Sequence, residues 1–175
     1  MCNVDCVKNF DFLIFGERFE LRENESLMVN FDGKFIELNP NSQNHLKRLE
    51  RVLRRRLLLE LEPAVQEYCK KLGLNFNRIT IKKQRSRWGS CSADGNLNFN
   101  LWLICLPKEL IRYVAWHEVA HLKENNHSRA FRDLIKMEFN YREMEKRLKE
   151  YWSAGKETSF LFDQGKASPH HHDPD

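Results

Sequence analysis

The segment His117-Glu118-Val119-Ala120-His121 lies within a stretch, Pro107 to Glu124, that has the apolar spacing of a helix. Proline is well placed at the first helical position, where a backbone N–H has no partner. Residues four apart on a helix share one face, with their Cβ atoms about 5–6 Å apart, so both imidazoles can reach one ion. Zinc accepts imidazole nitrogens, and Glu118 lies beside that face, where it can act on a water molecule as a general base. The segment therefore predicts a helix that carries a metal and a catalytic carboxylate.

A catalytic zinc site needs three protein ligands and an open position for water. His127 follows His121 by six residues, beyond the expected end of the helix. Between them, Asn125-Asn126 tolerates the left-handed conformation that a turn back toward the ion requires. We therefore expect zinc to be held by three histidines, His117, His121 and His127. The competing third ligand is a carboxylate on a following helix, Glu138 or Glu143.

A hairpin precedes this helix. The segment Arg85-Ser86-Arg87-Trp88-Gly89-Ser90-Cys91 is followed by a turn at Ala93-Asp94-Gly95 and a strand at Asn96–Asn100. In a structural interpretation, the tryptophan fills the core and the glycine marks a bulge. A compatible functional interpretation is that the strand edge pairs with an extended peptide, which a glycine lets approach closely. The expected substrate contacts are Arg87, Trp88, Gly89 and Ser90, whereas Cys91 is expected to be a buried thiol.

These residues together predict hydrolysis of a peptide bond. Glu118 would take a proton from the attacking water and pass it to the leaving amine. The developing oxyanion needs a further hydrogen-bond donor. Tyr113, Tyr141 and Arg87 are the candidates, and the sequence leaves all three open.

The rest of the chain predicts a mixed α and β fold. Short β-type runs within residues 10–38, with a turn at Asp32-Gly33, predict a small antiparallel sheet. A helix is expected from Gln43, and Pro63 is expected to begin a second one that Gly73 closes. A half-buried strand at Ile79–Lys83 precedes the hairpin, and two helices are expected near 128–138 and 140–151.

The expected organisation is one α+β domain over residues 1–165. It comprises an N-terminal β region (10–38), helices (42–73) and a core (78–152), in which the hairpin sheet packs on the metal helix and further helices follow. Residues 166–175 form a polar tail with three consecutive histidines. Of the 175 residues, 41% are hydrophobic and 31% charged, which is ordinary for a soluble globular protein.

Several classes of protein are excluded by composition. No apolar stretch approaches the roughly 20 residues of a membrane span, and the 7 glycines and 5 prolines argue against a fibrous or disordered chain. The five cysteines are odd in number and form no close pair, and the N-terminus has no secretory pattern. We therefore expect a cytoplasmic protein with reduced thiols.

Positive charge is concentrated in two segments. Residues 47–56 and 78–87 hold eleven of the 29 basic residues and one of the 25 acidic residues, Glu50. These segments are either solvated faces or a surface for nucleic acid or an acidic substrate. The alternative function is therefore a basic nucleic-acid-associated protein in which zinc only braces the fold.

The motifs resemble those of the YgjP-like metallopeptidase domain, a family that belongs with the SprT and WLM domains among the zincin-type proteases. The resemblance rests on residues 85–92, Asn100, Pro107, residues 117–122 and residues 126–128. It implies a zincin-like fold, a zinc hydrolase acting on protein or peptide, three histidine ligands at His117, His121 and His127, and a catalytic glutamate at Glu118. SprT-like relatives also suggest a protease that acts on DNA-bound proteins. The chain departs from the family pattern at Leu101-Trp102, where an aromatic and then a basic residue is expected.

Overall fold

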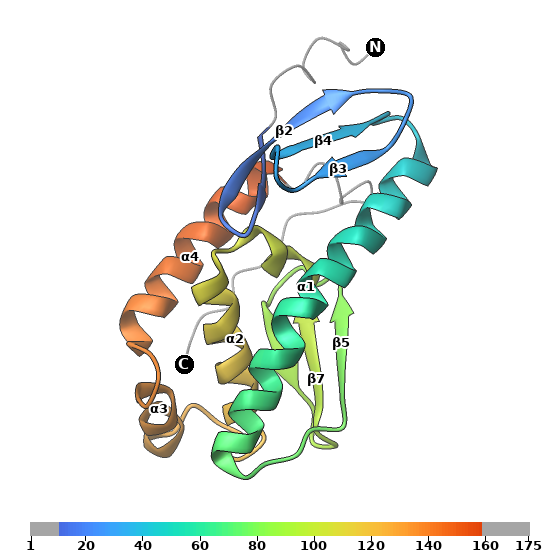
Figure 1. The fold of residues 1–175 in the computed structure, drawn as a ribbon. Helices are drawn as coiled ribbons and strands as arrows, with labels where there is room; N and C mark the ends of the chain where they lie inside the picture. The colour runs from blue at the N-terminus through green and yellow to red at the C-terminus, as the bar shows by residue number, and fades with distance from the viewer. Residues whose placement is uncertain (1–10, 159–175) are drawn as a thin grey trace.

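The computed structural model describes residues 11–158, arranged as two small sheets, four α-helices and one short 3-10 helix (Figure 1). The predicted α+β class is confirmed, whereas the histidine tail expected over 166–175 lies outside the described residues. The strands are β1 (Asp11–Ile14), β2 (Glu17–Glu23), β3 (Met28–Asn30), β4 (Phe35–Leu38), β5 (Arg78–Lys82), β6 (Gly89–Cys91) and β7 (Asn96–Asn100). The helices are α1 (Gln43–Leu72), the short 3-10 helix η2 (Leu101–Cys105), α2 (Lys108–Ala120), α3 (Arg129–Lys136) and α4 (Tyr141–Thr158).

The N-terminal sheet has the strand order β1-β2-β4-β3 and is mixed. The predicted turn at residues 32–33 joins β3 and β4 as an antiparallel pair, but β2 and β4 are parallel, with Leu21 opposite Ile36. The predicted antiparallel pairing is confirmed for β1 with β2 and for β3 with β4, and it was wrong for β2 with β4. The reason is burial: Ile36 and Leu38 are buried, whereas Met28 of β3 is 48% exposed. The more apolar strand therefore takes the central position and leaves β3 at the edge.

Helix α1 runs without a break through Pro63, so the expected second helix does not begin there. A proline inside a helix leaves the carbonyl four residues earlier without its donor. That residue, Leu59, is 58% exposed, so water can reach this side of the helix. Buried residues continue on the opposite face on both sides of the proline, which favours one long helix. Its ends agree with prediction: the Ser42 side chain accepts a hydrogen bond from the His45 N–H, and Gly73 has a φ of 65°.

The second sheet positions the candidate site. Its order is β5-β7-β6, with β7 parallel to β5 and antiparallel to β6, which confirms the predicted hairpin. Leu97 and Phe99 of the central strand are fully buried. Helix α2 lies between α1 and α4 (Figure 1) and also contacts β6. The Tyr68 and Trp116 rings lie edge to face at 4.7 Å and join α1 to α2.

Two further expectations concern thiols and membranes. Cys69, Cys91 and Cys105 are free thiols, while Cys2 and Cys6 lie outside the described residues. Across residues 11–158, no helix has the length and apolar character needed to cross a membrane.

Candidate metal centre

Three imidazoles converge where α2 ends. His117 lies in the last turn of α2, His121 caps the helix, and His127 follows a short turn. Each offers one ring nitrogen, and the three nitrogens lie within 4.8 Å of one another. The Nε2 atoms of His117 and His127 are 3.2 Å apart. Two nitrogens bound to one tetrahedral zinc would be about 3.3 Å apart, so the spacing fits that ion.

Backbone contacts fix the turn that returns His127 to the site. The Nδ1 atom of His121 is 2.9 Å from the Glu124 carbonyl oxygen. Because a carbonyl only accepts hydrogen bonds, Nδ1 carries the proton and Nε2 is left with a lone pair for a metal. The Arg132 guanidinium donates to the His127 carbonyl at 2.9 Å. The turn therefore sets the position of one ligand and the tautomer of another.

Phe131 of α3 forms an apolar support for all three imidazoles. Its ring lies 4.5 Å from that of His121, 4.9 Å from that of His117 and 4.8 Å from that of His127. The side chain is fully buried. Burial lowers the pKa of His117 to about 3, because the charged ring would be desolvated and would face the neighbouring imidazoles. His117 is thus neutral at physiological pH, as a metal ligand must be.

A carboxylate from α4, which the sequence reasoning missed, lies behind His117. Glu145 accepts a hydrogen bond from the Tyr113 hydroxyl at 2.6 Å. The same oxygen is 4.0 Å from Nδ1 of His117. This distance is longer than a hydrogen bond. A carboxylate beside Nδ1 nevertheless favours the ring orientation in which a ligating histidine directs its other nitrogen at a metal. The sequence predicted a helix near residues 140–151 that contains this glutamate, but nothing in its spacing indicated that the side chain would lie beside His117.

The two competing carboxylates are not part of the ligand cluster. Glu138 forms an ion pair with Lys71 of α1. Within residues 11–158, the group of side chains able to share a metal consists of three histidines and includes neither Glu138 nor Glu143.

Glu118 is buried next to this cluster, with an exposed fraction of 5%. Its Oε2 atom has no hydrogen-bond partner in the described part of the protein. Desolvation raises the pKa of the carboxyl to about 8, although the positive charge of Arg87 opposes the rise. A buried polar atom without a partner is costly. Its presence here marks a position where a water or substrate group can bind.

Two residues of the hairpin segment, Arg87 and Gly89, lie near Glu118. Gly89 and Ser90 belong to β6, at the edge of the sheet. Trp88 packs edge-on against Trp152 of α4 at 4.7 Å, in agreement with the structural interpretation. Arg87 is exposed, and its charge acts on the Glu118 carboxyl. The structure therefore places Gly89 and Arg87 near Glu118, whereas Trp88 packs on α4.

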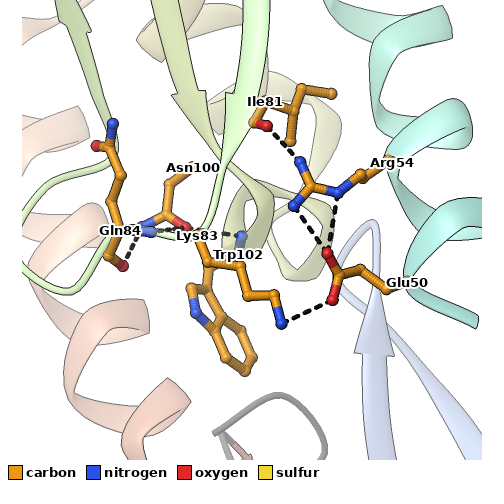
Figure 2. Close-up of polar contacts among 7 residues, drawn as sticks. All are labelled: Glu50, Arg54, Ile81, Lys83, Gln84, Asn100 and Trp102. Carbon is orange, nitrogen blue, oxygen red and sulfur yellow. Dashed lines mark hydrogen bonds and ion pairs between the residues drawn. The ribbon is translucent and has the colours of Figure 1, made fainter. Parts of the chain in front are cut away.

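Asn100 holds the loop that leads to this hairpin. Its amide nitrogen donates to the carbonyls of Gln84 and Arg87, both at 2.9 Å. Its side-chain oxygen accepts from the Trp102 backbone N–H at 3.2 Å (Figure 2). Trp102, which departs from the family pattern, makes this contact through its backbone N–H. Any residue except proline could make the same contact at position 102.

The oxyanion candidates differ in their surroundings. Tyr113 is fully buried, and its hydroxyl proton is directed at Glu145. Tyr141 is partly buried, and its pKa is raised by burial and by the charge of Glu145. Cys91 lies near Glu118, and burial and the carboxylate raise its pKa to about 11. The thiol is partly buried, and among the described residues it does not belong to the group of side chains able to share a metal.

Comparison with known proteins gave a family match and several similar solved structures, among them the two described next. The family model described as YgjP-like, metallopeptidase domain, matches residues 4–151. Crystal structures of two metallopeptidase zymogens, abylysin of Pyrococcus abyssi and jannalysin of Methanocaldococcus jannaschii, are similar at 23% and 24% identity. Both have TM-scores of 0.47; the matches cover 50% and 51% of this chain and 90% and 94% of theirs. No curated protein matched.

Proposed function

This chain belongs to the YgjP-like metallopeptidase family, and from that premise we propose that it is a zinc-dependent peptidase with Glu118 as its general base. Its metal ligands in this proposal are His117, His121 and His127. The observation that supports it best is the pairing of three convergent imidazoles with a buried, unpartnered carboxylate on the same helix.

The donor set fits zinc. Neutral imidazole is a preferred zinc ligand, and the 3.2 Å spacing of two of the nitrogens suits a tetrahedral ion. Zinc bound there would polarise the scissile carbonyl and lower the pKa of a water molecule toward 7. Among the described residues the cluster offers three protein ligands. Three ligands leave the fourth position for water and substrate, as in catalytic sites.

Glu118 moves the proton in this reaction. Its carboxylate takes a proton from the water that attacks the peptide carbonyl and passes it to the nitrogen of the leaving amine. In the metal-free protein burial raises the pKa of this carboxyl to about 8, and a zinc ion at the three histidines would oppose that rise and favour the ionised form that accepts the proton. Because Oε2 has no hydrogen-bond partner among residues 11–158, this atom can accept the proton without first giving up a contact there.

The substrate is held along β6 in this proposal. The strand lies at the edge of its sheet, so one side of its backbone is free to pair with an extended peptide. Gly89 places no side chain between that peptide and Glu118. Backbone pairing is tolerant of sequence, and Arg87 at the rim would favour substrates with acidic groups nearby.

The nucleic-acid-associated alternative with a structural zinc is less well supported. A structural zinc site usually has four protein ligands. Here the described cluster has three, and the thiol of Cys91 is not among them. A structural site also has no use for a buried carboxylate without a partner.

A peptide-library experiment tests the proposal. Zinc-loaded wild type and Glu118→Gln are incubated with peptides derived from a whole proteome, and new termini are identified by mass spectrometry. The proposal requires cleavage products that appear with wild type and disappear with the variant. The same products from both proteins would refute the role of Glu118.

A further inference from the structure

The two basic segments of the sequence meet on one surface. Arg54 of α1 donates to the Ile81 carbonyl of β5, and Glu50 of α1 pairs with Lys83 at 2.7 Å (Figure 2). Glu50 also pairs with Arg54 at 2.8 Å. The single acid of these segments is thus neutralised by two cations. All the other charged residues of the two segments are positive.

Some of these cations are held by contacts within the protein, and others are exposed to solvent and can be presented to a partner. Arg54 is tied to Glu50 and to the β5 backbone, and Arg56 lies over the Phe31 ring at 4.9 Å, against the N-terminal sheet. Neither is well placed to bind a partner. Lys83 is likewise paired with Glu50. The presented cations, which we name the α1–β5 patch, are Lys47, Arg48, Arg51, Arg55 and Lys82.

The patch is regular along α1. Lys47, Arg51 and Arg55 follow one another at four-residue intervals, so all three lie on one side of the helix about 6 Å apart along its axis. All three side chains are exposed. Lys82, exposed at the end of β5, adds one further cation beside the loop that leads to Arg87.

The chemistry of the patch favours phosphate over other anionic partners. Protein interfaces are centred on apolar side chains, and helices that bind lipid need an apolar face. Of the large apolar side chains exposed in residues 11–158, Val52, at 38%, is the one on this half of α1. Guanidinium groups bind phosphate oxygens in pairs, and a row of cations matches the repeated charge of a polyphosphate backbone.

We propose that the α1–β5 patch binds the phosphate backbone of nucleic acid without reading its sequence. Outside the two basic segments the chain has 18 basic and 24 acidic residues, so the segments that contain the patch are the part of the molecule attractive to a polyanion. Binding there is independent of the proposed peptidase chemistry, because Arg51 and Arg55 lie on α1, away from the histidines. The two proposals can therefore fail separately.

Salt-dependent binding of a fluorescein-labelled 20-base-pair DNA duplex to the zinc-loaded full chain tests the proposal. Each phosphate contact contributes about −0.9 to the slope of log Kobs against log salt. Between 50 and 200 mM NaCl we expect a slope of about −3 to −5 for wild type. Arg51→Glu/Arg55→Glu should weaken binding at least tenfold at 50 mM and make the slope shallower by about 2.

Lys70→Glu is the matched control, because Lys70 is an exposed cation at the other end of α1. It should bind within twofold of wild type. Lys47→Glu/Lys82→Glu provides an independent second variant, with one change on each element, should the first fail to fold. Hydrolysis of a short peptide should be the same in all folded variants.

Three results would overturn the proposal. The first is that wild type does not bind the duplex at 50 mM salt, and the second is that both double variants bind it as tightly as wild type. The third is that Lys70→Glu loses as much affinity as Arg51→Glu/Arg55→Glu. Competition identifies the class of partner: poly-glutamate or anionic vesicles of equal charge that displace the duplex completely would assign the patch to an acidic protein or a membrane instead.

Discussion

Gly89 and Glu118 are in direct contact across the sheet and the metal helix. A Cβ atom built on Gly89 would lie 2.8 Å from Oε1 of Glu118 and 2.9 Å from its Cγ. Both distances are shorter than van der Waals contact. The absence of a side chain at Gly89 therefore leaves the space that the Glu118 carboxylate occupies. In the proposed mechanism the same space also lets the substrate backbone approach the carboxylate.

Replacing Gly89 by alanine should displace Glu118 and leave the metal in place. We expect at least a tenfold loss in kcat/KM with an unchanged zinc content, because the histidines do not contact this residue. Peptide hydrolysis and metal analysis measure the two effects. Thr80→Ala, on β5 at the other edge of the sheet, is the control and should retain activity. Activity of Gly89→Ala within twofold of wild type would contradict the proposed position of the base.

Glu145 should act on the metal through His117. Glu145→Gln keeps the shape of the side chain and removes the charge that orients the imidazole, so zinc affinity should fall about 10- to 100-fold. Competition with a zinc chelator measures that affinity without reference to activity. Glu143→Gln changes an exposed carboxylate on the same helix and should leave the affinity unchanged. Equal zinc affinities for wild type and Glu145→Gln would show that the Glu145 charge does not orient His117 for metal binding.

His127→Ala tests the choice of third ligand. Loss of one imidazole should reduce zinc to substoichiometric levels, since two histidines alone hold zinc weakly. Glu138→Gln, in contrast, should bind zinc normally and lose only an ion pair with Lys71. The reverse pattern would assign the third position to a carboxylate.

The raised pKa of Glu118 predicts a pH dependence of stability in metal-free protein. The folded state keeps a proton up to about pH 8 that the unfolded chain releases near its ordinary value of 4.5. The stabilisation from this group is therefore complete below pH 4.5 and is lost as pH rises toward 8. The pKa of His117 is lowered from 6.5 to about 3, so its contribution changes only below about pH 6.5.

Urea unfolding between pH 6.5 and 8, with chelator present, isolates the carboxyl. Over this window the free energy of unfolding of wild type should fall relative to that of Glu118→Gln by on the order of 1–2 kcal/mol. Parallel curves for the two proteins would show that the carboxyl has no raised pKa.

The sequence predicted elements whose causes are local. Ser42 and Gly73 bound α1 because capping depends on side chains within a few residues of the helix end. The hairpin at β6 and β7 follows from its Asp-Gly turn. The three histidines were found because helical spacing places two of them together and a short turn can return the third.

What the sequence left open depends on distant contacts. The parallel pairing of β2 with β4 is decided by which strand can bury Ile36, and no local turn determines that. The continuity of α1 through Pro63 depends on the long buried face that the helix presents to α2. Glu145 reaches His117 from a helix 28 residues further along the chain, and only the packing of α4 on α2 shows the contact.

The central claim is that zinc at the three histidines and the carboxylate of Glu118 hydrolyse peptide bonds together. The most direct measurement is the zinc content and the rate of peptide cleavage of wild type and Glu118→Gln, purified and assayed in parallel. The account predicts one zinc per chain in both proteins and a loss of at least a hundredfold in rate for the variant. Stoichiometric zinc in both proteins with equal rates of cleavage would contradict it.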